Sequence, residues 1–184
     1  PCMRHLLTRP AILAAAAALA LSACATATPY QPAGFQGQRG GYAEQRLESN
    51  RYRVSFAGNS VTTREQVEMS LLLRSAELTV QDGYDWFSTV NRATDRDVRY
   101  GVTRDPFYYE RYRYWSPYWQ VYHRGLWSPW SDPFGRDIDV REIDRYEASA
   151  EIVMGRGTKP ADDPNAFDAR EVIQNVGPRL ARPN

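Results

Sequence analysis

Cysteine and histidine are scarce in this chain of 184 residues, which has two of each. With so few cysteine and histidine residues, we expect neither a His/Cys cluster that binds zinc nor a Cys–His pair in which the cysteine acts as a nucleophile. The sequence also has no G-x-S-x-G elbow, no G-x-G-x-x-G fingerprint and no P-loop. We therefore expect a protein that is not an enzyme, with no metal and no cofactor.

Long apolar runs are missing as well, with one exception near the start of the chain. Arg4 and Arg9 precede an apolar run of 11 residues, Ala11 to Leu21. As a helix this run rises about 16 Å, too little to cross a hydrocarbon core of about 30 Å. A basic segment followed by a short apolar run is typical of a secretory signal peptide.

The signal segment ends in Leu21-Ser22-Ala23-Cys24, the pattern of a bacterial lipobox. It predicts removal of residues 1–23 and lipidation of Cys24, with several acyl chains, palmitate among them, for stable anchoring. Ala25 stands where an aspartate would indicate retention in the inner membrane. By resemblance to sorted lipoproteins, we expect an anchor in the cell outer membrane and a domain facing the periplasm. The alternative is a soluble secretory signal with a chance cysteine, and Cys2 lies before Met3, where we expect translation to start.

The chain also lacks a large excess of positive or negative charge once the signal peptide is removed. Loss of Arg4 and Arg9 changes the formal net charge from +1 to −1. This balance argues against a nucleic-acid partner. A mature chain with one cysteine cannot form an intramolecular disulfide, so its core alone must hold the fold.

Composition divides the remaining chain into a tether and one domain. Residues 24–49 combine the lipidated cysteine with a segment rich in Ala, Thr, Gln, Pro and Gly, which predicts a flexible tether and a helical or irregular lead-in. Residues 50–180 are expected to form a single α+β periplasmic domain, with an aromatic insertion at 107–134. The fold class is a small sheet with one long and one short helix and an irregular aromatic-rich insertion.

The first half of the domain has the pattern of a strand, a helix and a strand. Residues 51–56 alternate between apolar and polar, and residues 84–90 predict a second strand. Between them, Thr62 and Glu65 form a capping box for a helix ending near Gly83. This helix carries two apolar stripes on nearly opposite sides, so something must cover its back. Short turns favour a parallel pair of strands with a right-handed crossover.

The second half predicts one more strand and a short helix. Residues 146–153 alternate, with Glu147 and Glu151 on the wet side. Asp168 then caps a helix that closes at 177–178. A further short strand is possible at 98–103.

Several segments of the domain resemble a family of uncharacterised proteobacterial lipoproteins. The matching wording is Asn50-Arg51-Tyr52-Arg53-Val54 with Phe56 and Gly58-Asn59, Gly83-Tyr84-Asp85-Trp86-Phe87, Tyr146-Glu147-Ala148 with Ala150-Glu151-Ile152, Lys159-Pro160, and Phe167-Asp168-Ala169-Arg170. Arg74 and Ala76-Glu77-Leu78 belong to it too. The resemblance covers most of residues 50–180 and implies no activity or site residues.

The aromatic segment is the most unusual part of the composition. Its 28 residues, Phe107 to Phe134, hold 12 of the 23 aromatic residues and four of the five tryptophans. Three prolines, Pro117, Pro129 and Pro133, argue against a long helix or a central strand here. The rings could pack over the second stripe of the long helix, form a binding platform, or sit at a membrane interface.

As a binding platform, the segment would use its Tyr, Trp and Arg side chains. The candidate residues are Tyr108, Tyr109, Arg111, Tyr112, Arg113, Tyr114, Trp115, Tyr118, Trp119, Tyr122, Arg124, Trp127 and Trp130. The leading hypothesis is a non-catalytic, lipid-anchored envelope protein that binds another envelope protein. The alternative is a module that binds peptidoglycan or another glycan. A minor alternative is a glycan hydrolase, for which Asp85, Glu147 and Glu151 are the candidate acids.

Overall fold

A computed structural model describes residues 26–90, 106–112, 114–115, 117–123, 126–129 and 145–183. Cys24, the predicted signal peptide and the possible strand at 98–103 lie outside these ranges. So do Arg113, Arg124 and Trp130 of the candidate surface, together with the side chains of Tyr108, Tyr109, Tyr122 and Trp127.

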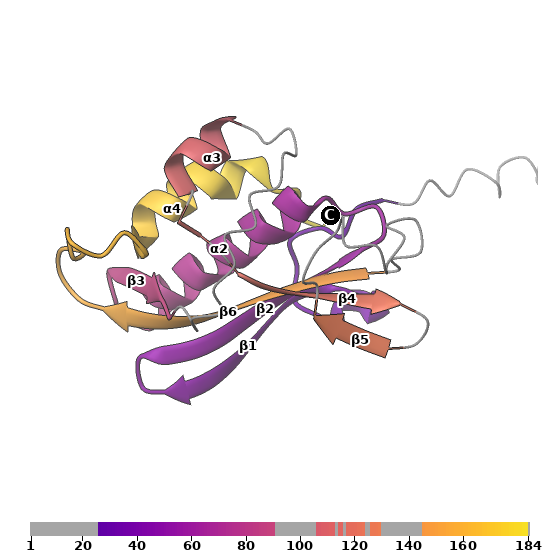
Figure 1. The fold of residues 1–184 in the computed structure, drawn as a ribbon, viewed down its shortest axis with the longest axis horizontal. Helices are drawn as coiled ribbons and strands as arrows, with labels where there is room; N and C mark the ends of the chain where they lie inside the picture. The colour runs from indigo at the N-terminus through magenta and orange to yellow at the C-terminus, as the bar shows by residue number, and fades with distance from the viewer. Residues whose placement is uncertain are drawn as a thin grey trace, which may run out of the picture.

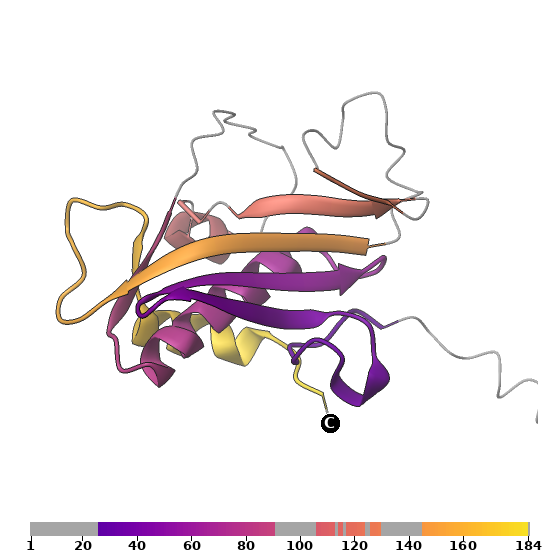
Figure 2. The same ribbon diagram turned by 90° about the horizontal axis from the view of Figure 1, so that it is seen from below.

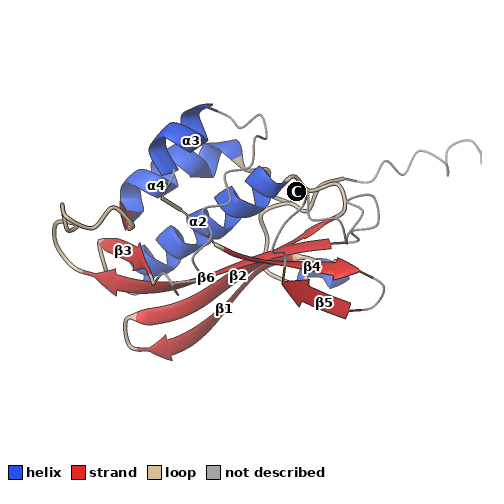
Figure 3. Ribbon diagram, in the orientation of Figure 1, coloured by secondary structure: helices blue, strands red, loops and turns tan. Residues whose placement is uncertain are grey.

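One antiparallel sheet of seven strands forms a layer, and three helices cover one of its faces (Figures 1 and 3). The strands are β1 (Gly41–Glu48), β2 (Arg51–Asn59), β3 (Trp86–Thr89), β4 (Tyr118–His123), β5 (Leu126–Pro129), β6 (Arg145–Gly155) and β7 (Ala166–Asp168). The helices are α2 (Arg64–Gln81), α3 (Pro106–Tyr112) and α4 (Ala169–Val176), with 3-10 turns η1 (Phe35–Gly37) and η3 (Gly177–Arg179). This arrangement confirms the α+β fold class.

The long strand β6 organises the sheet, whose order is β1-β2-β6-β3-β7. β2 pairs with β6 along one side, from Arg145 to Val153. On the other side, β4 pairs with Arg145–Ser149 and β3 with Ile152–Gly155. The β4–β5 hairpin and the β3–β7 pair therefore branch from the same side of β6, one after the other.

This topology corrects the prediction that the strands flanking the long helix are neighbours. β2 and β3 run in the same direction, but β6 lies between them: Ile152 is opposite both Tyr52 and Thr89. The element that separates them comes from the far end of the chain, so local pattern could not reveal it. The chain forms a split β-α-β unit.

The expectation that prolines exclude a central strand from the aromatic segment is also wrong. β4 lies between β5 and β6 and pairs with both. Pro117 comes directly before β4 and Pro129 is the last residue of β5. Neither proline interrupts a ladder, so the insertion is built partly of regular structure.

The main core lies between the sheet and α2. Val54 and Phe56 of β2, Ile152 of β6 and Phe87 of β3 are completely buried. α2 buries residues on both stripes, because the sheet covers one side and α4 packs against another. The capping box lies one residue later than predicted, with Thr63 as N-cap and Gln66 as its partner.

The predicted tether proves to be part of the fold from about residue 28 onward. The amide of Thr28 donates to Oγ1 of Thr62 (2.9 Å), and the Tyr42 amide donates to the Gln31 carbonyl (2.8 Å). Residues 41–48 form β1 rather than a helical or irregular lead-in. The composition of this segment gave no strand pattern, because β1 is stabilised by its pairing with β2.

Candidate functional site

The aromatic segment packs on the helix-covered side of the sheet through three of its rings. Tyr112, Trp115 and Trp119 are between 4% and 6% exposed and belong to the main core. The prediction that these three contribute to a binding surface is therefore wrong. Their burial supports the interpretation in which these rings are core, and their contacts with α2 lie at its start, at Glu68 and Arg64, whereas α4 packs along the helix.

Trp115 joins three elements in the core. Its indole Nε1 donates to the carbonyl of Glu68 in α2 (3.2 Å). Its ring makes edge contacts with Phe87 of β3, at a centroid distance of 6.2 Å, and with Phe167 of β7, at 5.9 Å. Edge contacts of this kind add to the burial of apolar area. The segment is thus fixed to both the helix and the sheet.

Trp119 fixes the β4 strand in the same way. Its ring lies between the guanidinium of Arg64, 4.9 Å from the centroid, and the ring of Tyr146, at 6.5 Å. Arg64 in turn pairs with Glu68 (3.1 Å). Because successive strand residues point to opposite faces, Tyr118 and Gln120 must face away from the helices.

Tyr118 lies on the face of the sheet away from the helices, which is the side nearest the viewer in Figure 2. We call this the polar face, and its central residues are Arg53, Ser55, Glu147, Ser149, Glu151, Tyr118 and Gln120. Tyr118 is 49% exposed and stands directly opposite Ser149, which is itself opposite Ser55. An aromatic ring beside two hydroxyl groups can stack on a ligand while hydrogen bonds orient it.

Other candidate residues are exposed but lie elsewhere in the segment. Tyr114 is 47% exposed. Arg111 pairs with Glu171 of α4 (2.8 Å), and its guanidinium lies over the ring of Phe107 at 5.3 Å. Leu126, which was not among the predicted residues, is 73% exposed at the start of β5. The exposed residues of the segment therefore lie at several places: Tyr118 on the polar face, Leu126 on the opposite face of the hairpin, and Arg111 beside α4.

The polar face also holds two of the three candidate acids. Burial raises the pKa of Glu147, and a hydrogen bond with Ser55 partly opposes that rise. Glu151 instead forms ion pairs with Arg51 and Arg53. Strand geometry places the Cα atoms of these two glutamates about 13 Å apart.

The third acid, Asp85, lies at the far end of β6. The amide of Gly157 (2.8 Å) and the guanidinium of Arg170 (2.7 Å) bind its carboxylate and hold its pKa below the usual value. The three candidate acids are therefore spread along β6. A glycosidase pair needs carboxyl groups about 5 to 9.5 Å apart at one point, and Asp85 is instead bound to Gly157 and Arg170 beyond the end of β6.

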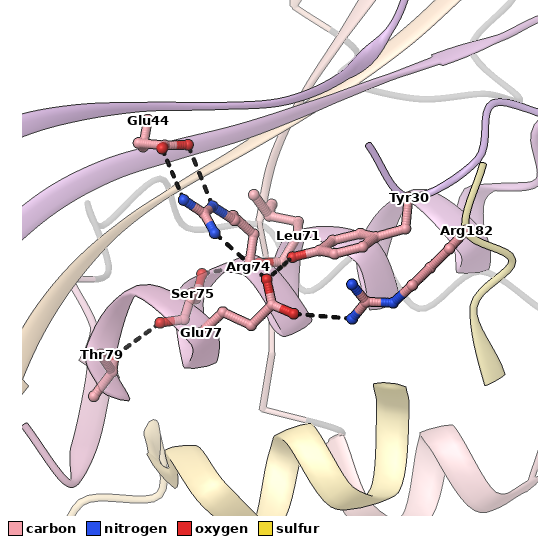
Figure 4. A network of polar contacts seen from close by, with 8 residues as sticks. All are labelled: Tyr30, Glu44, Leu71, Arg74, Ser75, Glu77, Thr79 and Arg182. Atoms are coloured by element: carbon pink, nitrogen blue, oxygen red, sulfur yellow. Dashed lines mark hydrogen bonds and ion pairs between the residues drawn. The ribbon is translucent and has the colours of Figure 1, made fainter. Parts of the chain in front are cut away.

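A second polar cluster joins the two ends of the described chain (Figure 4). Arg74 of α2 binds both carboxylate oxygens of Glu44 in β1, at 2.8 and 3.3 Å, and also contacts Glu77 (3.4 Å). Glu77 accepts a hydrogen bond from the Tyr30 hydroxyl (2.5 Å) and pairs with Arg182 (3.1 Å). Burial and the bond to Glu77 raise the pKa of Tyr30 far above its usual value.

Sequence reasoning missed Tyr30 and Arg182 because both lie in segments with no periodic pattern. Two residues of the sequence segments quoted above for the lipoprotein resemblance, Asn50 and Trp86, make contacts between distant parts of the chain. The Asn50 side chain donates to the Met154 carbonyl (3.1 Å), and Trp86 packs across Gly155, where a Cβ atom would overlap its ring. These two residues therefore join β6 to the turn before β2 and to β3.

Comparisons with known proteins give no further identification: no family model, no curated protein and no solved structure matches this chain. Within the described residues, no group of three or more His, Cys, Asp or Glu side chains could hold a metal ion. No helix in that part of the chain has the length and apolar character to span a membrane.

Proposed function

We propose that this protein is a lipid-anchored component of the bacterial cell envelope that binds another envelope protein without catalysis. The observation that carries the binding role is the exposed ring of Tyr118 directly beside the buried rings of the aromatic segment. Tyr112, Trp115 and Trp119 fix the segment in the core, so the exposed Tyr118 is presented from a rigid base. Rigid aromatic side chains lose little conformational entropy on binding and are common in protein interfaces.

The exposed ring has the character of an interface anchor. Tyr118 supplies an amphipathic ring on the polar face, beside the hydroxyl groups of Ser149 and Ser55. Single exposed apolar residues are ordinary, but rings held in place by a buried neighbour are preorganised for contact. The proposed partner is a protein whose surface offers a pocket for a tyrosine ring.

Crosslinking in cells tests this role. A photo-reactive amino acid at position 118 of the full chain is expected to capture a protein of different sequence, identified by mass spectrometry. The matched control places the same group at Phe35, an exposed aromatic residue in η1 far from the segment in sequence. Equal capture from both positions, or none from 118, would contradict the proposal.

The lipid anchor is tested separately by labelling cells with an alkyne fatty acid. The Cys24→Ser variant is expected to lose the label, whereas Cys2→Ser keeps it, because only Cys24 follows the lipobox pattern. Fractionation of the outer membrane then tests the location. Label retained by Cys24→Ser would rule out the proposed anchor.

A glycan is the second candidate ligand, and one observation favours it. Tyr118 has Ser149 and Ser55 in its row of the polar face, and Gln120 lies opposite Glu147 in the next row of the same face. Aromatic faces stack on sugar rings, and these neighbours offer groups for sugar hydroxyls. Co-sedimentation of the full chain with purified peptidoglycan is expected to fall in Tyr118→Ala if this candidate is correct. Unchanged co-sedimentation in Tyr118→Ala would exclude this face as the site.

A further inference from the structure

The exposed edge strand β1 is complementary to a second copy of itself. β1 is the outermost strand of the sheet, and six of its eight residues are exposed. Among the described residues, its ladder partner is β2, and an isolated bridge links Pro32 to Tyr42 at its start. An edge strand with free backbone groups is a template for pairing with another chain.

The backbone of β1 fixes which residues can pair outward. The Tyr42 amide and carbonyl point away from β2, since they bond to Gln31 and Ala33. Along an antiparallel strand this direction alternates, so Glu44 and Arg46 also present their amide and carbonyl groups outward. Ala43 and Gln45 direct theirs toward β2.

The segment that binds Tyr42 also limits how far a partner strand can extend. Gln31 and Ala33 occupy the outward groups of Tyr42. At the other end, the register with β2 shifts between Arg46 and Glu48. Among the described residues, the regular edge without a ladder partner therefore runs from Ala43 to Arg46.

Only one antiparallel register of two such edges satisfies both the backbone and the charges. Pairing around Gln45 places Glu44 opposite Arg46 of the second copy, and Arg46 opposite its Glu44. Each of these pairs can exchange two backbone hydrogen bonds, and each places Arg46 beside Glu44, an acid that also binds Arg74 of its own copy. The other registers that match outward groups place Glu44 opposite Glu44 or Arg46 opposite Arg46, and like charges in this position are destabilising.

We propose that two copies of this chain associate through β1, in an antiparallel pair centred on Gln45, so that their sheets become continuous. The interface is isologous, as a twofold axis requires. Its short length predicts a concentration-dependent dimer rather than an obligate one, because stable interfaces bury about 1,200 Å² or more. This proposal does not depend on the proposed function, since it concerns a different edge of the sheet.

Disulfide trapping tests the register directly. In the full chain carrying Cys2→Ser and Cys24→Ser, purified in mild detergent, Gln45→Cys is expected to form a covalent dimer under oxidising conditions. Gln45 would be a non-hydrogen-bonded pair with Cα atoms about 4.5 Å apart, within disulfide range. Ala43→Cys alone places its thiol about 13 Å from its own copy and is expected to give little dimer.

A backbone variant provides the second arm. Arg46→Pro removes an amide that points outward and leaves the bonds to β2 intact, so the monomer is expected to fold. In the Gln45→Cys background this change is expected to reduce crosslinking at least tenfold, with circular dichroism unchanged. Equal crosslinking at positions 43 and 45, absence of a covalent dimer at 45, or full crosslinking in folded Arg46→Pro would overturn the proposal.

Discussion

Arg74 lies almost entirely inside the protein, yet it carries a positive charge that two carboxylates balance. Only 8% of the residue is exposed, and it binds Glu44 and Glu77. Its guanidinium also lies over the ring of Tyr42, 4.5 Å from the centroid. A buried cation of this kind is costly to desolvate, and removing it leaves its acidic partners uncompensated.

Replacing Arg74 with methionine keeps most of the side-chain volume and removes the charge. We expect the free energy of unfolding to fall by about 3 kcal/mol, because Glu44 and Glu77 lose their shared partner. Urea denaturation followed by tryptophan fluorescence measures this change. Arg182→Met is the matched control: that arginine is largely exposed, so its loss should cost about 1 kcal/mol or less. Similar losses in both variants would mean that the Arg74 cluster is not the stabilising unit.

Glu147 should affect stability in the opposite direction. Burial raises its folded pKa above the ordinary value of 4.5, so ionisation disfavours the folded state. As pH rises from the unfolded pKa through the folded pKa, the unfolded chain releases its proton first and the protein loses stability. Glu147→Gln removes this loss and should be more stable than the original chain at pH 7.

The control for this substitution lies four residues along the same strand. Glu151 is paired with Arg51 and Arg53, so Glu151→Gln should reduce stability at pH 7. Urea denaturation at pH 4 and pH 7 separates the two effects. A Glu147→Gln variant that is less stable at pH 7 would show that the carboxylate has a favourable partner.

At the scale of elements, the aromatic segment is half core and half surface, and single substitutions can separate the two halves. Trp115→Ala should reduce the free energy of unfolding by about 3–5 kcal/mol, since it removes a buried ring between α2, β3 and β7. Tyr118→Ala should change it by about 0.5 kcal/mol or less, because this ring lies on the surface. Thermal or urea denaturation of both variants checks the assignment, and equal losses would refute it.

Elements whose signals are local were predictable from the sequence, and those that depend on distant pairing were not. Asp168 caps α4 as expected, with its carboxylate accepting from the Glu171 amide. The alternation at 146–153 correctly placed Ala148 and Ile152 in the core. In contrast, the position of β6 between β2 and β3 follows from contacts 63 or more residues apart, from Thr89 to Ile152 upward, which no periodicity encodes.

The candidate site shows the same limit. Composition identified the aromatic segment, but it could not separate Trp119 from Tyr118, which are adjacent residues on opposite faces of β4. That distinction depends on the register of β4 with β6, where Trp119 stands opposite the buried Ala148. Predicting which residues of a segment are buried and which are exposed therefore requires the strand pairing as well as the residue types.

At the scale of the whole molecule, the two ends of the described chain meet on one side of the helix α2. The Tyr30 amide donates to the Ala181 carbonyl (2.8 Å), and Glu77 binds both Tyr30 and Arg182. Tyr30 also contacts the ring of Tyr42 at a centroid distance of 5.0 Å. The segment before β1 thus acts as part of the core rather than as a spacer.

Amide hydrogen exchange distinguishes a folded segment from a flexible one at this position. Exchange at the amides of Tyr30 and Tyr42 should be slow, because both are bonded to carbonyls in the fold. The Glu44 amide points outward from β1 and should exchange quickly at low protein concentration, which makes it an internal control. A flexible tether would instead exchange rapidly at all residues before Gly41. Slow exchange at Tyr30, lost together with that at Tyr42 in a Glu77→Ala variant, would show that Glu77 couples the start of the described chain to β1.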